Sequence, residues 1–162
     1  MSAPRMPSTP AVLALRAAGI NFTPHFYNYE ERGGTTVSAR ELGVDEHAVI
    51  KTLVMQDETA RPCVVLMHGD CEVSTKALAR IVGVKRIEPC KPEVAERHTG
   101  YRVGGTSPFG TRRKMPVYLE KTALDLPGIY INGGSRGFLV GIPPEAVVSL
   151  LRPELVTIAI RP

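Results

Sequence analysis

The segment of residues 99–116, TGYRVGGTSPFGTRRKMP, combines glycines, a Ser-Pro step and three consecutive basic residues. Glycine lets the backbone approach a ligand closely and adopt positive φ, so N–H groups around Gly104 and Gly105 could point at an oxygen atom. Donors of this kind stabilise the oxyanion that develops in acyl transfer. A hairpin or bulge without a ligand also explains the glycines, and the spacing is not that of a nucleotide phosphate loop.

A second candidate is Lys51, which enters the apolar run IKTLVM. A lysine in such a strand can be partly desolvated, and its amine then becomes useful in a binding or catalytic site. Alternatively, Lys51 lies at the end of the strand and keeps its ammonium group in water. The same two interpretations apply to Tyr27 in the aromatic run FTPHFYNY.

Basic residues beside predicted turns form a third candidate group: Lys85, Arg86, Arg112, Arg113, Lys114 and Arg136. Around a cleft, these side chains could bind phosphate groups. A solvated face is the alternative interpretation, because charged side chains mostly lie in water. We call residues 100–110 the glycine-rich segment. The position of residues 112–114 shortly after it favours a functional role for them.

Common nucleophile, metal and cofactor motifs are absent from the sequence. It contains no Gly-x-Ser-x-Gly step, no HExxH and no dinucleotide-binding fingerprint. His68, Cys71, Cys90 and His98 could be combined into a metal site, but their spacing is not one that zinc sites use. We therefore expect neither a metal nor a cofactor.

The hydrophobic pattern and the turn residues predict the elements that position these side chains. Helices are expected over residues 10–18, 37–42, 75–82, 92–99 and 143–153, with Ser8 and Ser74 as N-caps of the first and third. Residues 45–48 suggest a short turn. Strands are expected over residues 22–29, 49–55, 62–68, 85–89, 116–120, 128–132, 137–142 and 155–160. We predict an α/β (α+β-like) fold with a mixed, mostly antiparallel, strongly curled, barrel-like sheet and flanking helices.

The composition bounds the class of protein. For 162 residues we expect a disordered tail over residues 1–8 and a single domain over residues 9–162. Twenty Lys and Arg against sixteen Asp and Glu give a net charge of +4, which suits a polyanionic partner. The absence of Trp, with only five Tyr and four Phe, argues against a base-stacking platform. Three cysteines without a CxxC pair, and no signal peptide or membrane span, predict a soluble cytoplasmic protein with free thiols.

Four stretches together resemble the YbaK/EbsC-like aminoacyl-tRNA deacylases: KTLVM, GVKRIEP, the whole of residues 99–116, and IYINGGSRG. The resemblance runs from about residue 10 to the C-terminus. It is strongest to the free-standing deacylases that remove cysteine from proline tRNA. The family also includes the editing domain of bacterial prolyl-tRNA synthetase, which favours alanine.

The resemblance implies roles for individual residues. The family's essential lysine falls on Lys51, and its glycine whose N–H faces the substrate carbonyl falls on Gly104, with Gly105 beside it. The residues implied in substrate binding are Tyr27, Thr52, Thr106, Ser107, Pro108, Asn132 and Gly133. Those implied in contact with the tRNA 3′ end are Arg112, Arg113, Lys114 and Arg136.

The implied function is hydrolysis of mischarged tRNA, Cys-tRNA(Pro) first of all, with the thiol of the substrate attacking its own ester. Aminoacyl-tRNA is the implied partner, and prolyl-tRNA synthetase is a candidate second partner. Two positions depart from the family pattern and leave the preferred amino acid open: Asn132 replaces a frequent serine, and Leu139 stands where some members carry a polar or acidic residue. The alternatives are water attack on Ala-tRNA or another small aminoacyl-tRNA, and a non-catalytic module that binds tRNA or a synthetase.

Overall fold

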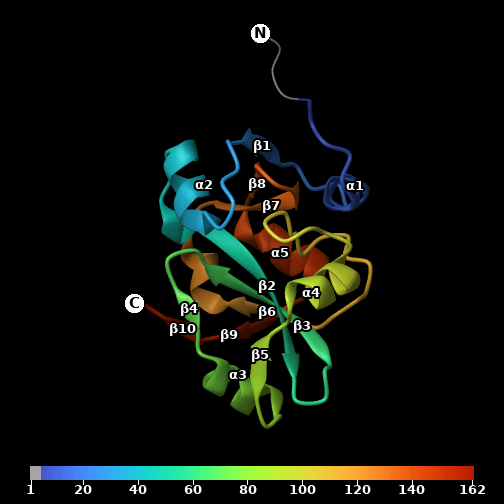
Figure 1. Ribbon diagram of the computed structural model, residues 1–162. Helices are drawn as coiled ribbons and strands as arrows, with labels where there is room; N and C mark the ends of the chain where they lie inside the picture. The colour runs from blue at the N-terminus through green and yellow to red at the C-terminus, as the bar shows by residue number, and fades with distance from the viewer. Residues whose placement is uncertain (1–4) are drawn as a thin grey trace.

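A computed structural model describes residues 5–162 of the chain (Figure 1). Residues 1–4 of the expected tail lie outside this range, and residues 5–8 form neither helix nor strand. The helices within the described range are α1 (Pro10–Ala17), α2 (Gly34–Leu42), α3 (Thr75–Val82), α4 (Pro92–Thr99) and α5 (Pro144–Leu151), with two 3-10 helices, η1 (Glu46–Ala48) and η2 (Lys121–Asp125). None of these described helices has both the length and the apolar character that a bilayer span requires.

Eight strands form one sheet in the order β1-β8-β7-β2-β3-β6-β9, with β5 paired to β2 beside this path. A second sheet consists of β4 and β10. The strands are β1 (Thr23–Phe26), β2 (Val49–Asp57), β3 (Pro62–His68), β4 (Glu72–Val73), β5 (Ile87–Pro89), β6 (Val117–Glu120), β7 (Ile129–Ser135), β8 (Phe138–Ile142), β9 (Glu154–Val156) and β10 (Ala159–Ile160).

The large sheet is mixed, as predicted, but it is open. Four of its seven pairings are antiparallel, and β2·β7, β3·β6 and β6·β9 are parallel. Within residues 5–162 no pairing joins its end strands, β1 and β9. The expectation of a strongly curled, barrel-like sheet is therefore wrong. The sheet branches at β2, because β7 pairs with only two residues of this strand and β5 takes the same edge further along.

Local signals set most element boundaries. Ser74 caps α3 by accepting from the N–H of Ala77, as predicted. The cap of α1 is Thr9 rather than Ser8, and its hydroxyl accepts from the N–H of Val12. Thr9 also donates to the carbonyl of Gly133 on β7, so this cap joins the first helix to the sheet.

The predicted strand over residues 155–160 is divided into β9 and β10. The buried carboxylate of Glu120, at the end of β6, accepts from the N–H groups of Ile158 (2.7 Å) and Ala159 (2.8 Å). These two bonds turn the chain away from β6, and β10 pairs with β4 instead. The pattern of apolar residues alone does not contain this break.

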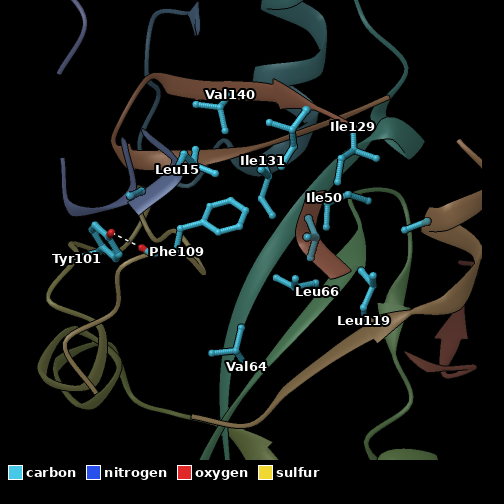
Figure 2. Packing of buried hydrophobic residues seen from close by; sticks show 14 of the residues in the cluster. Leu15, Ile50, Val64, Leu66, Tyr101, Phe109, Leu119, Ile129, Ile131 and Val140 are labelled. Carbon is cyan, nitrogen blue, oxygen red and sulfur yellow. Dashed lines mark hydrogen bonds between the residues drawn. The ribbon is translucent and has the colours of Figure 1, made fainter. Parts of the chain in front are cut away.

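The main hydrophobic core lies on one face of the central strands. Ile50 and Val54 of β2 pack there with residues of α1, β3 and β7. Phe109, from the segment after α4, is fully buried in the same cluster (Figure 2). Tyr101 donates its hydroxyl to the carbonyl of Phe109, and burial raises the pKa of Tyr101 to about 12. The glycine-rich segment is therefore anchored in the core at both of these aromatic residues.

Strand β2 has a gap along one of its edges. Its pairing with β7 covers Val49 and Ile50, and its pairing with β5 covers residues 55–57. Among the residues that the structure describes, none pairs as a strand with residues 51–54 on this edge. This gap contains the Lys-Thr step that the sequence singled out.

Candidate functional site

A cavity of about 620 Å³ lies beside the gap in β2. Its volume is in the range of small-molecule sites. Residues from five parts of the chain line it: residues 49–55 on β2, residues 27–38 before and within α2, the segment around α4, the glycine-rich segment, and the β7–β8 pair. The sequence-predicted residues among them are Tyr27, Lys51, Thr52, Gly104, Thr106, Asn132, Arg136 and Leu139.

Lys51 lines the cavity without a counter-ion. Within residues 5–162, no carboxylate lies within 4.0 Å of its ammonium group. The lysine is half-buried rather than freely solvated. A cation held in this way can stabilise negative charge on a bound molecule.

Thr52 adds unpaired polar groups to the same place. Its hydroxyl oxygen is buried and has no hydrogen-bond partner among the described residues. The carbonyl of Val49 accepts on the β3 side of β2, and the carbonyl of Val54 accepts from Cys90 on the opposite side. Because successive backbone groups of a strand alternate in direction, the N–H and C=O of Thr52 face the gap. Buried polar groups are normally paired, so a ligand is a natural partner for these.

Gly104 lines the cavity, and its backbone N–H is unpaired among the described residues. Gly104 has φ +90°, and a Cβ there would lie 2.5 Å from the hydroxyl of Tyr29. No described residue accepts from its N–H group. The N–H of Gly105 differs, because it donates to the carbonyl of Arg102 (2.8 Å). Of the two glycines, Gly104 alone offers a free backbone donor.

Three other predicted residues lie outside the lining of the cavity. Ser107 is fully buried, and its hydroxyl accepts from the N–H of Phe109 (3.2 Å). Pro108 is buried beside it. Gly133 is buried too, and a Cβ there would meet the ring of Phe138 at 2.3 Å. These three residues are buried outside the lining, while Thr106 lines the cavity itself.

Asn132 connects the glycine-rich segment to β7. Its side-chain amide donates to the carbonyl of Gly104 (3.3 Å). Its side-chain oxygen accepts from the N–H groups of Gly134 (2.6 Å) and Ser135 (3.2 Å). The amide is thus largely used within the protein, and it fixes the position of Gly104.

Two tyrosines and an arginine form another part of the wall. Tyr27 lies directly after β1, and burial raises the pKa of its hydroxyl. The guanidinium of Arg136 lies 4.9 Å from the centre of the Tyr29 ring and donates to the carbonyl of Val103 (2.9 Å). Sequence reasoning missed Tyr29. The i, i+2 spacing of the two tyrosines was the available signal, since it places both on one side of an extended chain.

Sequence reasoning also missed the residues of the α2 region that line the cavity. Glu30, Glu31, Arg32, Thr35 and Ser38 belong to it. Residues 30–34, EERGG, combine charged residues with two glycines but match no motif that the sequence analysis used. Glu30 is paired with Arg40 of α2 at 3.4 Å.

The predicted basic residues 112–114 lie outside the lining of the cavity, next to the end of α4. The N–H of Arg112 donates to the carbonyl of Thr99, and the N–H of Arg113 donates to that of His98. All three basic side chains of this stretch are exposed. Helix α4 contributes Pro92 and Ala95, from its first half, to the cavity, whereas these cations lie at its C-terminal end and outside the lining.

The cavity contains no pairing of a nucleophile with a histidine. No histidine is among its lining residues in the described part of the chain. Cys90 is the lining thiol, and burial, together with Glu88, raises its pKa. A raised pKa keeps the thiol protonated, and the thiolate is the reactive form. The described lining therefore shows no histidine-activated nucleophile and no thiol with a lowered pKa.

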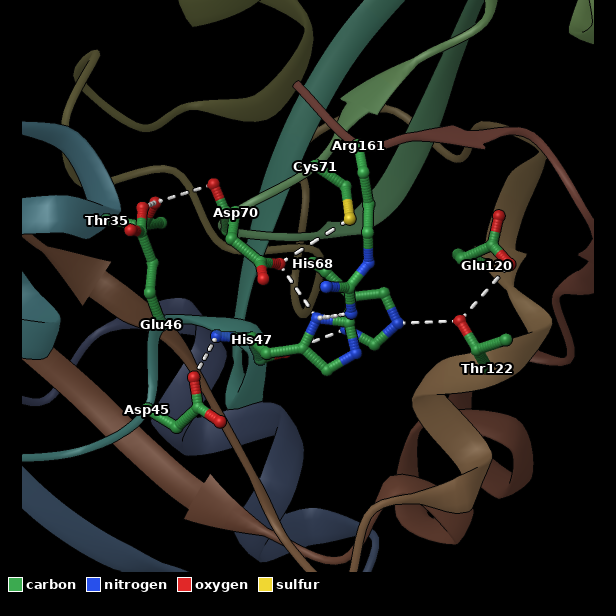
Figure 3. Close-up of polar contacts among 11 residues, drawn as sticks. Thr35, Asp45, Glu46, His47, His68, Asp70, Cys71, Glu120, Thr122 and Arg161 are labelled. Atoms are coloured by element: carbon green, nitrogen blue, oxygen red, sulfur yellow. Dashed lines mark hydrogen bonds and ion pairs between the residues drawn. The ribbon is translucent and has the colours of Figure 1, made fainter.

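A separate polar cluster joins η1, β3 and the C-terminal segment (Figure 3). The ring of His47 stacks on His68 at 3.7 Å between centroids, and its Nδ1 lies 2.8 Å from an oxygen of Asp70. Cys71 lies close enough that His47, Asp70 and Cys71 could share a metal ion, with ligand atoms within 4.8 Å of one another. The guanidinium of Arg161 lies 3.5 Å from the same Nδ1, which opposes a second cation there. The four residues that the sequence analysis considered and set aside, His68, Cys71, Cys90 and His98, share only Cys71 with this trio.

Comparison with known proteins gives a family match over residues 31–150, to the aminoacyl-tRNA editing domain. The chain is 33% identical over 120 residues to an Enterococcus faecalis protein with the provisional name Cys-tRNA(Pro)/Cys-tRNA(Cys) deacylase EbsC. This match covers 74% of the present chain and 73% of that protein. It is also 30% identical over 100 residues to a proline–tRNA ligase of Nitratidesulfovibrio vulgaris, covering 62% of this chain but only 16% of the ligase.

The fold has counterparts among solved structures. One crystal structure, described provisionally as a trans-editing enzyme for prolyl-tRNA synthetase, superimposes with a TM-score of 0.81 at 21% sequence identity. The match covers 96% of this chain and 99% of the other. At this identity the likeness extends to the fold only.

Proposed function

Since the chain belongs to the aminoacyl-tRNA editing domain family, we propose that it deacylates mischarged tRNA, with Cys-tRNA(Pro) as its main substrate. The observation that carries the proposal is the cavity at the gap in β2, where Lys51 has no counter-ion and the N–H of Gly104 has no acceptor among the described residues. The choice of cysteine and of proline tRNA rests on the 33% identical relative.

In the proposed reaction the N–H of Gly104 donates to the ester carbonyl oxygen as it becomes negative. Lys51 stabilises the charge that develops on the reacting oxygens. Groups fixed before the reaction are effective because they need no reorganisation when the charge forms. Thr52 has an unpaired hydroxyl and a backbone that faces the gap, so it contacts the aminoacyl group beside them.

The substrate thiol is the proposed nucleophile. Its sulfur bonds to the carbonyl carbon and loses its proton, and the bond from that carbon to the 3′-oxygen of the tRNA breaks. The 3′-oxygen takes up a proton and leaves as a hydroxyl, and water then opens the cyclic thioester to free cysteine. Confinement of the thiol next to its own ester is the contribution of the cavity walls. The absence of a histidine among the described lining residues favours this route over a protein nucleophile.

The exposed cations of residues 112–114 and Arg136 are proposed to contact the 3′ end of the tRNA. Tyr27, Thr106, Asn132 and Leu139 complete the walls around the amino acid. Leu139 is 4% exposed and apolar, so it selects by size. Size selection between cysteine and alanine is worth only about 1–3 kcal/mol, and the amino acid preference is therefore sensitive to this wall. We further propose prolyl-tRNA synthetase as a partner that supplies the mischarged tRNA.

The test is release of amino acid from Cys-tRNA(Pro) and Ala-tRNA(Pro), measured side by side. We expect the wild type to release cysteine faster, and Lys51→Ala to slow release by roughly 100-fold or more, the effect of removing an electrostatic stabiliser. Lys121→Ala is the matched control, since Lys121 is exposed and does not line the cavity.

Three results would change the proposal. Full activity of a folded Lys51→Ala variant would remove the lysine from the mechanism. Faster release of alanine would replace thiol attack by water attack. Release of neither amino acid by the wild type would favour a non-catalytic module that binds tRNA.

A further inference from the structure

A second, smaller cavity of about 360 Å³ lies between α3 and β5. We refer to it as the α3–β5 pocket. Its lining contains four basic residues and no acidic one: Thr75, Lys76, Ala79, Arg80, Val84, Lys85, Arg86 and Ile87. The proposed deacylation gives no role to these residues.

The four cations of the α3–β5 pocket are arranged around a small apolar floor. Lys76 and Arg80 are one turn apart on α3, so their side chains lie on the same face as Ala79. Lys85 and Arg86 come from the connection between α3 and β5. All four are exposed, and within residues 5–162 none has a carboxylate within 4.0 Å of its charged group.

Two acidic residues belong to the same region but do not neutralise the pocket. The carboxylate of Glu58 accepts from the backbone N–H groups of Lys85 (3.1 Å) and Arg86 (3.5 Å), not from their side chains. Glu88 alternates with Ile87 along β5 and therefore points to the other face of that strand. The pocket keeps an excess of positive charge.

The α3–β5 pocket and the large cavity lie at opposite ends of the short strand β5. Pro89 of β5 lines the large cavity, and Ile87 lines the pocket. Ile87 is in register with Asp57 of β2, six residues beyond Lys51. At about 3.3 Å per residue this places the pocket about 20 Å from the lysine.

On the basis of the proposed function, we infer that the α3–β5 pocket binds the phosphate backbone of the tRNA acceptor stem while the aminoacyl end occupies the large cavity. The 3.4 Å spacing of a B-form strand would make 20 Å about six nucleotides from the ester, and the more compact A-form acceptor stem makes it roughly six or seven. Lys and Arg neutralise phosphates whatever the sequence. The pocket therefore contributes affinity for tRNA and no preference among tRNAs.

The experiment measures the Kd of uncharged tRNA(Pro) as a function of salt concentration. We expect the double variant Lys76→Ala/Arg80→Ala to weaken binding at low salt and to reduce the slope of log K against log salt by about 1.4–1.8, which is two phosphate contacts. The control variant Arg16→Ala/Lys121→Ala loses the same charge from exposed residues outside both cavities, and its slope should stay at the wild-type value.

A second measurement separates this inference from the proposed deacylation. The cysteinyl ester of adenosine carries the reacting group but no acceptor stem, so Lys76→Ala/Arg80→Ala should cleave it at the wild-type rate. If the wild type cleaves no ester but Lys76→Ala/Arg80→Ala still reduces the salt slope of tRNA binding, the proposed deacylation is wrong and phosphate binding by the α3–β5 pocket is supported. Three results would overturn the inference that the α3–β5 pocket binds tRNA phosphates. They are an unchanged slope in Lys76→Ala/Arg80→Ala, an equal reduction of the slope in the control variant, and a wild type that does not bind tRNA.

Discussion

At the level of single residues, the side chain of Asn132 makes two kinds of hydrogen bond whose effects can be separated. It donates to the carbonyl of Gly104 and accepts from the N–H groups of Gly134 and Ser135. The first bond holds the proposed oxyanion donor in place, and the other two hold the turn after β7. We therefore expect Asn132, which lines the cavity, to act on the reaction mainly by positioning Gly104.

We predict that Asn132→Ala lowers kcat/KM by about tenfold, since a displaced donor gives up part of its transition-state stabilisation. The melting temperature should also fall, because loss of these bonds costs about 1 kcal/mol each. The measurements are steady-state deacylation and thermal unfolding of the same preparation.

Asn132→Asp distinguishes the effects of the two kinds of hydrogen bond. Its carboxylate keeps the acceptor for Gly134 and Ser135 but cannot donate to Gly104, so stability should be retained while kcat/KM falls. Wild-type kcat/KM in the aspartate variant would show that the bond to Gly104 is dispensable.

The sequence predicts which residues lie together at the site better than it predicts which of their backbone N–H groups are free of internal hydrogen bonds. The family resemblance predicts Lys51, Gly104 and Tyr27 as site residues, and all three line one cavity. Gly105 belongs to the same motif, yet its N–H is used within the segment. Whether a backbone donor is free depends on the bonds of the turn, and residue types do not specify these. Catalytic and binding roles for these residues stay predictions.

At the level of elements, the β2–β3 hairpin contains a compact network around Asp57. One carboxylate oxygen accepts from the N–H of Thr59 (2.8 Å), the hydroxyl of Thr59 (2.8 Å) and the N–H of Arg61 (3.0 Å). The other accepts from the side chain of Arg61 at 2.9 Å. Burial alone would raise the pKa of Asp57, but these hydrogen bonds outweigh it and lower the pKa from 3.8 to about 2.

We predict that Asp57→Asn loses stability relative to the wild type at neutral pH and that this difference shrinks in acid. The folded-state pKa is below the ordinary value, so the stabilisation by the carboxylate is fully present above pH 3.8 and is lost as pH falls toward 2. Urea unfolding of both proteins between pH 2 and pH 6 measures it. A stability difference that does not change over this range would mean that the charge of Asp57 is irrelevant to the hairpin.

Elements with local signals were predicted, and those decided by distant contacts were not. The hairpin, α3 and α4 follow from alternation, a serine cap, an N-terminal proline and terminal glycines. The short strand β4 and the break between β9 and β10 were missed. Both depend on Glu120, which meets residues 38 and 39 positions further along the chain. No local pattern records such a partner.

At the level of the whole molecule, the sheet order was the least predictable feature. Parallel pairs such as β3·β6 and β6·β9 join strands far apart in sequence, and short connections had argued for antiparallel neighbours. The gap in β2 follows from the same topology, because β7 and β5 share one of its edges. The site is therefore a product of strand order as much as of motif. A single domain over residues 9–162 is consistent with this sheet and stays a prediction.

Contacts between cations and phosphates make tRNA affinity fall with salt. Two exposed basic groups of this protein are candidates for such contacts: residues 112–114 beside α4, and the α3–β5 pocket. We predict that Arg112→Ala/Arg113→Ala weakens tRNA binding and reduces the salt slope by about 1.4–1.8. Combining it with Lys76→Ala/Arg80→Ala should add the two reductions, because distant sites that contact one bound tRNA act independently. Titration of fluorescent tRNA at several salt concentrations measures both.

An unchanged slope for Arg112→Ala/Arg113→Ala would identify this group as a solvated face. A combined loss no larger than either single loss would instead mean that the two groups are alternative docking positions, each used without the other.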